Sequence, residues 1–249
     1  MPHTLSEVTA LLLQALAIER HGLRSTLAKS LLASILAAAP AAPAAPAASG
    51  GRASAEIHAV KLYELPWSTN VERVTLAAAH KGIELEHVTP EDRETLRVVS
   101  GQELVPVLEH EGTVVVDSPV ILAYLEEIVP DPTIYPGNRA AIEIFIDWFN
   151  RVWKVAPNSI AETGEPDPWS AEMQRHLDWF EVLLGDRTFL FGEALSAADF
   201  VAFPFLKYAA GRNRADDELF HRVLEEHQSV AGRPALRAWI ERMDARPRA

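Results

Sequence analysis

An acid and a hydroxyl stand directly before a helix pattern, at Asp117 and Ser118. Pro119 follows them, and proline suits the first position of a helix because its missing N–H is not needed there. The first turn of a helix has free N–H groups and the positive end of the helix dipole, which together attract a carboxylate. The pattern therefore predicts a carboxylate site with Ser118 as the cap, and the plainer alternative is a helix cap beside a favourable acid.

Pro106 interrupts an apolar run that otherwise reads as a strand, LVPVLEH. Proline cannot donate to a strand ladder, so it belongs at the end or edge of a strand. A cis bond between Val105 and Pro106 costs only about 0.5–1 kcal/mol over the trans form. It would turn the backbone of Val105 outward, where it could pair with another chain. The alternative is a trans proline that breaks an edge strand.

Hydrophobic periodicity predicts the elements that position these residues in a small α/β domain with helices packed on a mixed sheet. Gly82 closes the first helix of this domain, and Glu111-Gly112 forms a hairpin turn. The order is β-α-β-α-β-β-α, with strands at 57–63, 83–90, 104–110 and 113–118 and helices at 68–82, 91–99 and 118–129.

After a proline-rich connector at 130–137, every periodic segment is helical, which predicts an all-helical second domain at 138–249. The expected helices lie at about 139–156, 169–185, 197–210, 215–228 and 234–245. Ser196 and Asp199 form a capping box, with Leu195 and Phe200 as its hydrophobic staple. Phenylalanines crowd around this helix, so we expect it to be central, and we assign the box to folding and not to chemistry.

Residues 1–55 differ in composition from the rest of the chain. Leucines recur there at helical spacing, and an Ala/Pro-rich linker follows. We expect a poorly ordered leader helix and linker, with the α/β domain covering residues 56–129. The leader resembles a signal peptide only in part, because its leading region is too long. No uncharged apolar run reaches the ~18 residues that a membrane span needs.

Charge and composition exclude several functions. The net charge of −12 predicts that the chain binds neither nucleic acid nor anionic membranes. The absence of cysteine excludes structural disulfides, thiolate metal sites and a protein-cysteine nucleophile. The nine histidines do not show metal-binding spacing, so we expect no metal site.

Three motifs together resemble the glutathione S-transferase family, over about residues 57–249. They are the Val105-Pro106-Val107-Leu108 run, Asp117-Ser118 followed by VILAYLEE, and FLFGEALSAADF at 189–200. The resemblance implies a thioredoxin-like domain that binds glutathione, an all-α second domain and a cytoplasmic homodimer. It also implies that Val105 bonds the cysteine of glutathione as an added strand, that Ser118 takes the γ-glutamyl carboxylate and that Asp117 takes the α-ammonium.

Members of this family activate the thiol of glutathione with Tyr or Ser, or use a Cys. Tyr63 lies too early, inside the first strand, whereas Ser68 stands where Ser-type, bacterial-like members carry their serine. A hydroxyl that donates to the sulfur beside a helix N-terminus stabilises the thiolate. Lowering the thiol pKa by about two units takes about 2.7 kcal/mol, which two such donors could supply. Thr69 and Asn70 are rivals for this role, and all three residues could be caps only.

The chain departs from the family just before Val105. A basic or amide side chain usually meets the glycine carboxylate of glutathione there, and this sequence has Gln102 and Glu103. Gln102 could donate, but Glu103 would repel the carboxylate, so a related low-molecular-weight thiol is an alternative cosubstrate.

An apolar pocket for the electrophile is expected between the domains. Its candidate lining residues are Trp67, Trp148, Phe149 and Trp153, although an aromatic stripe at helical spacing is more often core.

The resemblance implies an enzyme that conjugates the thiol of glutathione, as cosubstrate, to hydrophobic electrophiles, as in detoxification. Ser68 would hold the thiolate, and no protein-bound intermediate would form. Two alternatives use the same fold: a glutathione-dependent isomerase, dehalogenase or peroxidase, and a non-catalytic glutathione-binding or regulatory protein.

Overall fold

The computed structural model describes residues 60–249. The expected leader and linker at 1–55 lie outside this range. In the first part of the described chain the elements are β1 (Val60–Tyr63), α3 (Thr69–Lys81), β2 (Leu85–Val88), α4 (Arg93–Ser100), β3 (Val107–His110), β4 (Thr113–Val116) and α5 (Ser118–Ile128). Their order and types agree with the prediction from periodicity.

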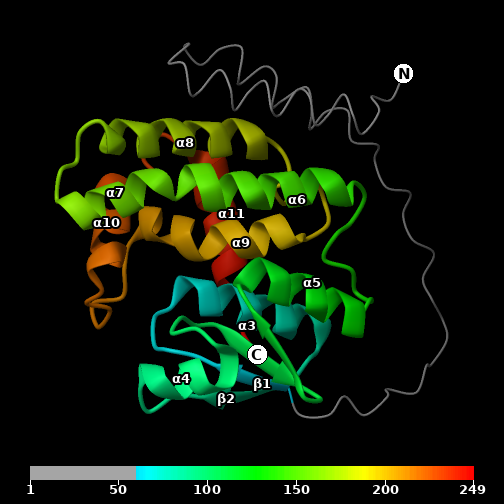
Figure 1. Cartoon of the computed structure of the whole chain (residues 1–249). Coiled ribbons are helices and arrows are strands. Elements are labelled where there is room, and N and C mark those ends of the chain that lie inside the picture. The colour runs from blue at the N-terminus through cyan, green and yellow to red at the C-terminus, as the bar shows by residue number, and fades with distance from the viewer. Residues whose placement is uncertain (1–59) are drawn as a thin grey trace.

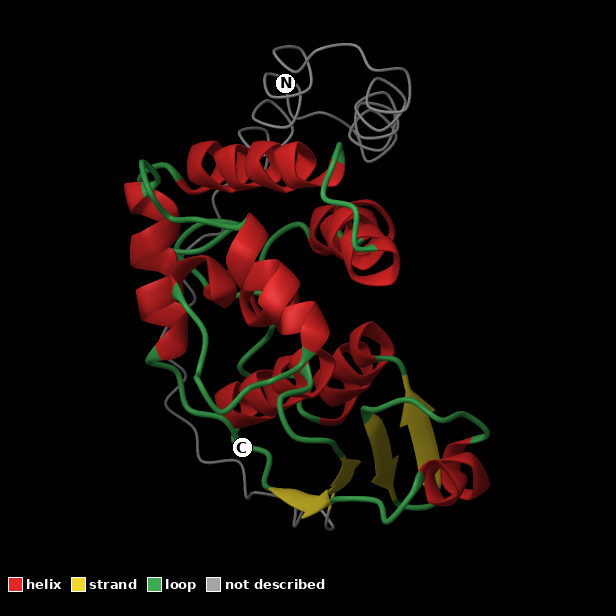
Figure 2. Ribbon diagram, turned by 90° about the vertical axis from the view of Figure 1, so that its left-hand side faces the viewer, coloured by secondary structure: helices red, strands yellow, loops and turns green. Residues whose placement is uncertain are grey.

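The four strands form one mixed sheet in the order β2-β1-β3-β4. β1 is parallel to β2 and antiparallel to β3, and β4 pairs antiparallel with β3. Side chains alternate between the two faces. Leu62 and Leu108 enter the large core that α3 and α5 cover, whereas Tyr63 and Val107 face Leu96 of α4 on the other side. Figure 2 shows α4 on one face of the sheet and the remaining helices on the other.

The helical part lies above the face of the sheet that α3 and α5 cover (Figure 1). It consists of α6 (Arg139–Trp148), the π-helix η1 (Phe149–Trp153), α7 (Val155–Thr163), α8 (Trp169–Leu184), α9 (Ala197–Leu206), the 3₁₀-helix η2 (Lys207–Ala210), α10 (Leu219–His227) and α11 (Pro234–Asp244). The predicted helix at 139–156 is thus three segments that run on to residue 163.

The central position of α9 is confirmed, because every residue from Ala197 to Leu206 is buried. The predicted capping box is present at its start. Asp199 also accepts hydrogen bonds from Leu190 N and from Trp239 Nε1, both at 2.9 Å. This carboxylate therefore joins three segments of the helical core, and its role is structural.

Cap residues fix the ends of the helices that matter for the site. Ser68 Oγ accepts a hydrogen bond from Val71 N at 3.3 Å, and Gly82 ends α3 with a φ of +69°. At α5 the structure corrects the prediction: the cap position is Asp117 and not Ser118, which is the first helical residue. Asp117 caps without a side-chain hydrogen bond. Its carboxylate is therefore free for another role.

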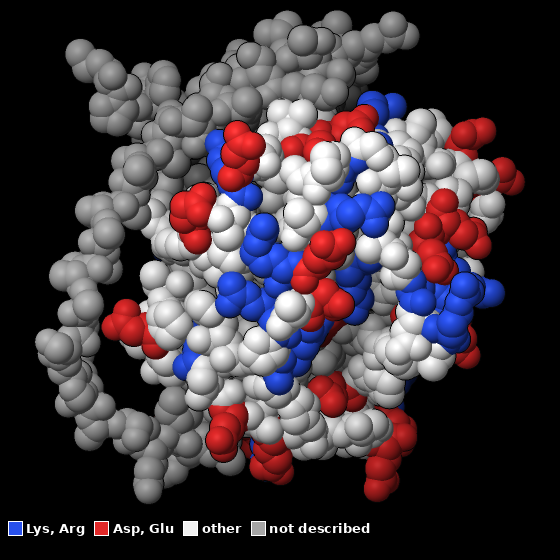
Figure 3. Space-filling view, turned by 180° about the vertical axis from the view of Figure 1, so that it is seen from behind, with Lys and Arg blue, Asp and Glu red and all other residues white. Residues whose placement is uncertain are grey.

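Charge is unevenly distributed over the surface. Figure 3 shows Lys and Arg gathered in the middle of one face, with Asp and Glu between them, although the net charge of the chain is −12. Within the described range, no helix is long and apolar enough to cross a membrane.

Candidate functional site

The start of α5 has the backbone geometry of a functional site. Asp117 is exposed and has φ +71° and ψ +119°, a combination that a residue with a side chain rarely adopts. Such conformations persist where the surrounding structure enforces them, and they cluster at ligand sites. Ser118 follows with its side chain buried, and its Oγ accepts a hydrogen bond from Arg73 Nη1 at 3.1 Å. Ser118 Oγ is thus anchored inward by the guanidinium of Arg73.

Arg73 links this helix start to the helical part of the protein. Its Nε donates to Val201 O at 3.0 Å, and its Nη1 also donates to Asn150 Oδ1 at 3.0 Å. The guanidinium lies 4.6 Å from the centre of the Phe205 ring. Burial lowers the pKa of Arg73 to about 9, with Asp117 opposing the shift, so the side chain stays charged at neutral pH. The N-terminal end of α5 therefore has a buried cation directly behind it.

The position of Arg73 in the sequence is itself a signal, although no motif above includes it. Arg73 lies among the buried residues of α3, between Val71 and Leu76, so it is a lone cation within an apolar stripe. A buried arginine needs several acceptors, which predicts contacts with loops and helix ends. Its partners, however, come from distant parts of the chain and could not be named from the sequence.

The segment before β3 has the predicted cis bond between Val105 and Pro106. Pro106 is buried and Val105 is half-buried, packed against the core. Gln102 Nε2 donates to Leu104 O at 3.1 Å, so this amide is engaged within its own loop.

Glu103 has basic partners. It forms an ion pair with Arg97 of α4, and Arg93 Nη1 lies 3.8 Å from its Oε2. The expected repulsion of a carboxylate is therefore partly offset by two arginines.

The three candidates for thiol contact lie at the start of α3, and they differ in burial and in hydrogen bonding. Ser68 is half-buried and caps the helix, Thr69 is buried, and Asn70 Oδ1 accepts from Lys154 Nζ at 3.2 Å. Because Ser68 Oγ uses a lone pair for the cap, its hydroxyl proton can still donate to a bound anion. Tyr63 is buried in β1 and donates to Glu109 Oε2 at 3.0 Å, as its early position indicated.

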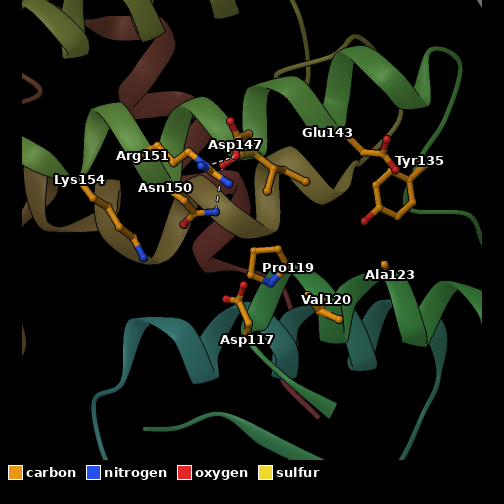
Figure 4. Close-up of a pocket in the computed structure, with 11 residues that line it drawn as sticks. Asp117, Pro119, Val120, Ala123, Tyr135, Glu143, Asp147, Asn150, Arg151 and Lys154 are labelled. Carbon is orange, nitrogen blue, oxygen red and sulfur yellow. Dashed lines mark hydrogen bonds and ion pairs between the residues drawn. The ribbon is translucent and has the colours of Figure 1, made fainter.

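A cleft of about 530 Å³ lies between α5 and the segment from α6 to Lys154. Figure 4 shows the Lys154 side chain reaching down into it and the Asp117 carboxylate pointing up from the start of α5. The other residues that line the cleft are Pro119, Val120, Ala123, Tyr135, Glu143, Ile146, Asp147, Asn150 and Arg151. The cleft therefore lies between the two parts of the chain, and both apolar and charged side chains line it.

The expected aromatic pocket does not form. Phe149 and Trp153 stack at 4.4 Å and are buried at 0% and 1% exposure, so they belong to the core. Trp148 is half-buried and packs against Trp179 of α8. Trp67, at 42% exposure, lines a different cleft, of about 380 Å³, beside Tyr208 and Asp244. The aromatic stripe is explained by helix packing at the π-helical segment.

The described residues contain no group of three or more His, Asp or Glu side chains that could hold a metal ion.

Two family models match this chain. The model of the glutathione S-transferase N-terminal domain matches residues 62–133, and that of the C-terminal domain matches residues 146–242. Among curated proteins, glutathione S-transferase L1 of Arabidopsis thaliana is 28% identical over 145 residues, which are 56% of either chain. A probable glutathione S-transferase of Nicotiana tabacum is 29% identical over 152 residues, 57% of this chain and 68% of the relative. The chain thus spans about half the length of the Arabidopsis relative.

Solved structures share the fold. A Tau class glutathione S-transferase from mango, Mangifera indica, has a TM-score of 0.63 at 23% identity, covering 76% of this chain and 90% of that chain. Rice GST1, solved in complex with glutathione, has a TM-score of 0.60 at 26% identity, and the match covers 74% of this chain and 86% of the rice chain. A bacterial glutathione S-transferase from Rhodospirillum rubrum has a TM-score of 0.60 at 25% identity, and the match covers 76% of this chain and 89% of the bacterial chain. Because most of these relatives are plant proteins, the bacterial-like, Ser-type subgroup stays a prediction.

Proposed function

Since the chain belongs to the glutathione S-transferase family, we propose that it conjugates the thiol of glutathione to hydrophobic electrophiles. The observation that carries the proposal is the pair of helix starts: Ser68 opens α3, Ser118 opens α5, and Arg73 of α3 bonds Ser118 at 3.1 Å. The bond from Arg73 thus fixes α3 against the start of α5, and the two positive helix ends suit the thiolate and the carboxylate of one ligand. The relative from rice was solved with glutathione bound.

Each site residue has a role in this proposal. Ser68 donates its hydroxyl proton to the sulfur, and Val105 pairs its backbone with the cysteine of glutathione as an added strand. Asp117 accepts from the α-ammonium, while Ser118 and its N–H take the γ-glutamyl carboxylate. The thiolate attacks the electrophilic carbon directly, so the sulfur–carbon bond forms as the leaving group departs with its electron pair.

The test compares wild type with Ser68→Ala in a conjugation assay with an aromatic halide. Loss of this one donor should raise the pKa of the bound thiol by about one unit, which lowers kcat/KM roughly 10-fold near neutral pH. Thr69→Ala and Asn70→Ala test the rival residues, and Ser159→Ala on α7 is a matched control. Undiminished activity of Ser68→Ala would contradict the assignment of Ser68.

Retention on immobilised glutathione separates this proposal from the alternatives. A non-catalytic binding or regulatory protein of the same fold would be retained but would leave the halide unchanged. A glutathione-dependent isomerase, dehalogenase or peroxidase would be retained and would act on other substrates in the same cleft.

We also propose a cytoplasmic homodimer that acts in detoxification. Val114 of β4 is 40% exposed and Val120 of α5 is 52% exposed, and Val120 lines the cleft. Association would remove these apolar side chains from water. Light scattering after gel filtration should give twice the mass of the chain.

A further inference from the structure

A lysine amine is held inside the cleft beside the proposed thiol site. Lys154 Nζ donates to Asn70 Oδ1 at 3.2 Å and lies 4.4 Å from the centre of the Phe205 ring of α9. Asn70 belongs to the first turn of α3, two residues after Ser68. The amine is therefore fixed against the turn that Ser68 caps, and its side chain lines the cleft (Figure 4).

Charged groups face this amine from two other elements. Arg73 of α3 lies close enough to repel a protonated Lys154, and Asp117 at the start of α5 attracts it. On the same segment as Lys154, Arg151 is paired with Asp147. Burial, followed by Arg73, lowers the pKa of Lys154 to about 7, against the opposing effect of Asp117. A substantial share of the uncharged amine is thus present at neutral pH.

Arg73 provides a second sign that an anion belongs in this part of the protein. Its Nη2 is buried and has no hydrogen-bond partner among the described residues. Two cationic side chains, Arg73 and Lys154, therefore lie close together, and Asp117 is the acid that offsets both of them. A bound anion would relieve the repulsion between them.

We propose that Lys154 is the base that takes the proton of the bound thiol. The inference rests on the proposed function, because it requires a thiol at the start of α3. The S–H bond breaks and an N–H bond forms on Nζ, so a neutral thiol and a neutral amine become a thiolate and an ammonium. No proton passes to solvent and nothing is oxidised or reduced. Ser68 then donates to the sulfur, while Lys154 supplies the opposite charge.

The acid strengths allow this transfer. A thiol with an ordinary pKa near 8.5 is a weaker acid than an ammonium with a pKa of about 7. Once the ion pair forms, opposite charges within about 4–6 Å shift each pKa by about one to three units, which closes the gap. The dipole of α3 favours the thiolate further.

The experiment is a proton count on the full chain. Glutathione is titrated by calorimetry at about pH 8, where the amine is uncharged and the free thiol is largely protonated. Repeating the titration in buffers of different ionisation enthalpy gives the number of protons released on binding. Ultraviolet absorbance gives the amount of thiolate formed. S-methylglutathione, which has no thiol proton, provides the blank. Wild type should form thiolate with almost no proton release.

Two variants distinguish a base from a fixed charge. Lys154→Arg keeps a cation that cannot accept a proton, so it should release about one proton for each thiolate formed. Lys154→Met should raise the pKa of the bound thiol by about one unit or more. Lys61→Met, on β1, removes a lysine elsewhere and should behave as wild type.

The inference is overturned if wild type releases as many protons as Lys154→Arg, or if Lys154→Met leaves the thiolate absorbance unchanged. These results differ from a failure of the proposed function, in which wild type would bind no glutathione at all.

Discussion

At the scale of single residues, we expect Glu103 to influence which thiol the proposed site accepts. The glycine carboxylate of glutathione should lie near the loop before Val105, on the side away from Ser118. In that loop the Gln102 amide bonds Leu104 O, and Glu103 engages Arg97. Because internal bonds already use these groups, we expect the glycine end of glutathione to gain little from them.

It follows that γ-glutamylcysteine, which lacks this glycine, should be used about as well as glutathione. Replacing Glu103 with Gln would free Nη2 of Arg97 for the glycine carboxylate, while Nη1 stays paired with Glu94 at 2.8 Å. One exposed ionic contact contributes about 0.5–1 kcal/mol. We therefore expect Glu103→Gln to raise the preference for glutathione about two- to five-fold, measured as the ratio of kcat/KM for the two thiols. Glu127→Gln, at an exposed position of α5, is the control. An unchanged ratio in Glu103→Gln would contradict this account.

At the scale of elements, strong capping residues in the sequence were sufficient to predict where helices begin and end. Ser68 and Gly82 marked both ends of α3, and the Ser196 capping box marked the start of α9. The predicted type and extent of the helix near Phe149 were less accurate, because hydrophobic spacing does not distinguish a π-helical segment from an α-helix. Lys154 follows directly after this segment. The sequence therefore placed the helix starts of the site to within one residue but did not reveal the cations, whose positions depend on packing between distant helices.

Lys81 joins the end of α3 to α5 and to the connector. Its Nζ lies 2.5 Å from Glu126 Oε2, 2.6 Å from Val129 O and 3.0 Å from Pro132 O, and its side chain is fully buried. The lysine therefore holds the junction between the two parts of the chain.

Removing Lys81 would leave Glu126 without its cation. Breaking a buried pair in this way costs about 3–5 kcal/mol, so Lys81→Met should lower the free energy of unfolding by that order in urea titrations. The double variant Lys81→Met/Glu126→Leu should recover part of the loss. A single variant as stable as wild type would show that the pair contributes little.

At the scale of the whole molecule, contacts between the two parts assemble the site. Arg73 of α3 bonds Val201 O of α9 and Asn150 of η1, and the C-terminal Ala249 N donates to Thr75 O of α3 at 3.0 Å. The helical part therefore holds α3 from several sides. The unusual pKa of Lys154 exists only in this assembled state, so it must appear in the pH dependence of folding.

The pKa of Lys154 falls from 10.5 to about 7 on folding, because burial and Arg73 disfavour its charge. Between these values the unfolded chain binds more protons than the folded one, so this residue makes stability rise with pH. Its contribution rises by at most about 1.4 kcal/mol per pH unit from about pH 7 to 10.5 and is flat below pH 7. The difference between the unfolding free energies of wild type and Lys154→Met, measured in urea at a series of pH values, should follow this course. Arg73 titrates in both proteins, so only the part of its contribution that is coupled to Lys154 remains in the difference. Parallel profiles would mean that Lys154 keeps an ordinary pKa and cannot serve as the base.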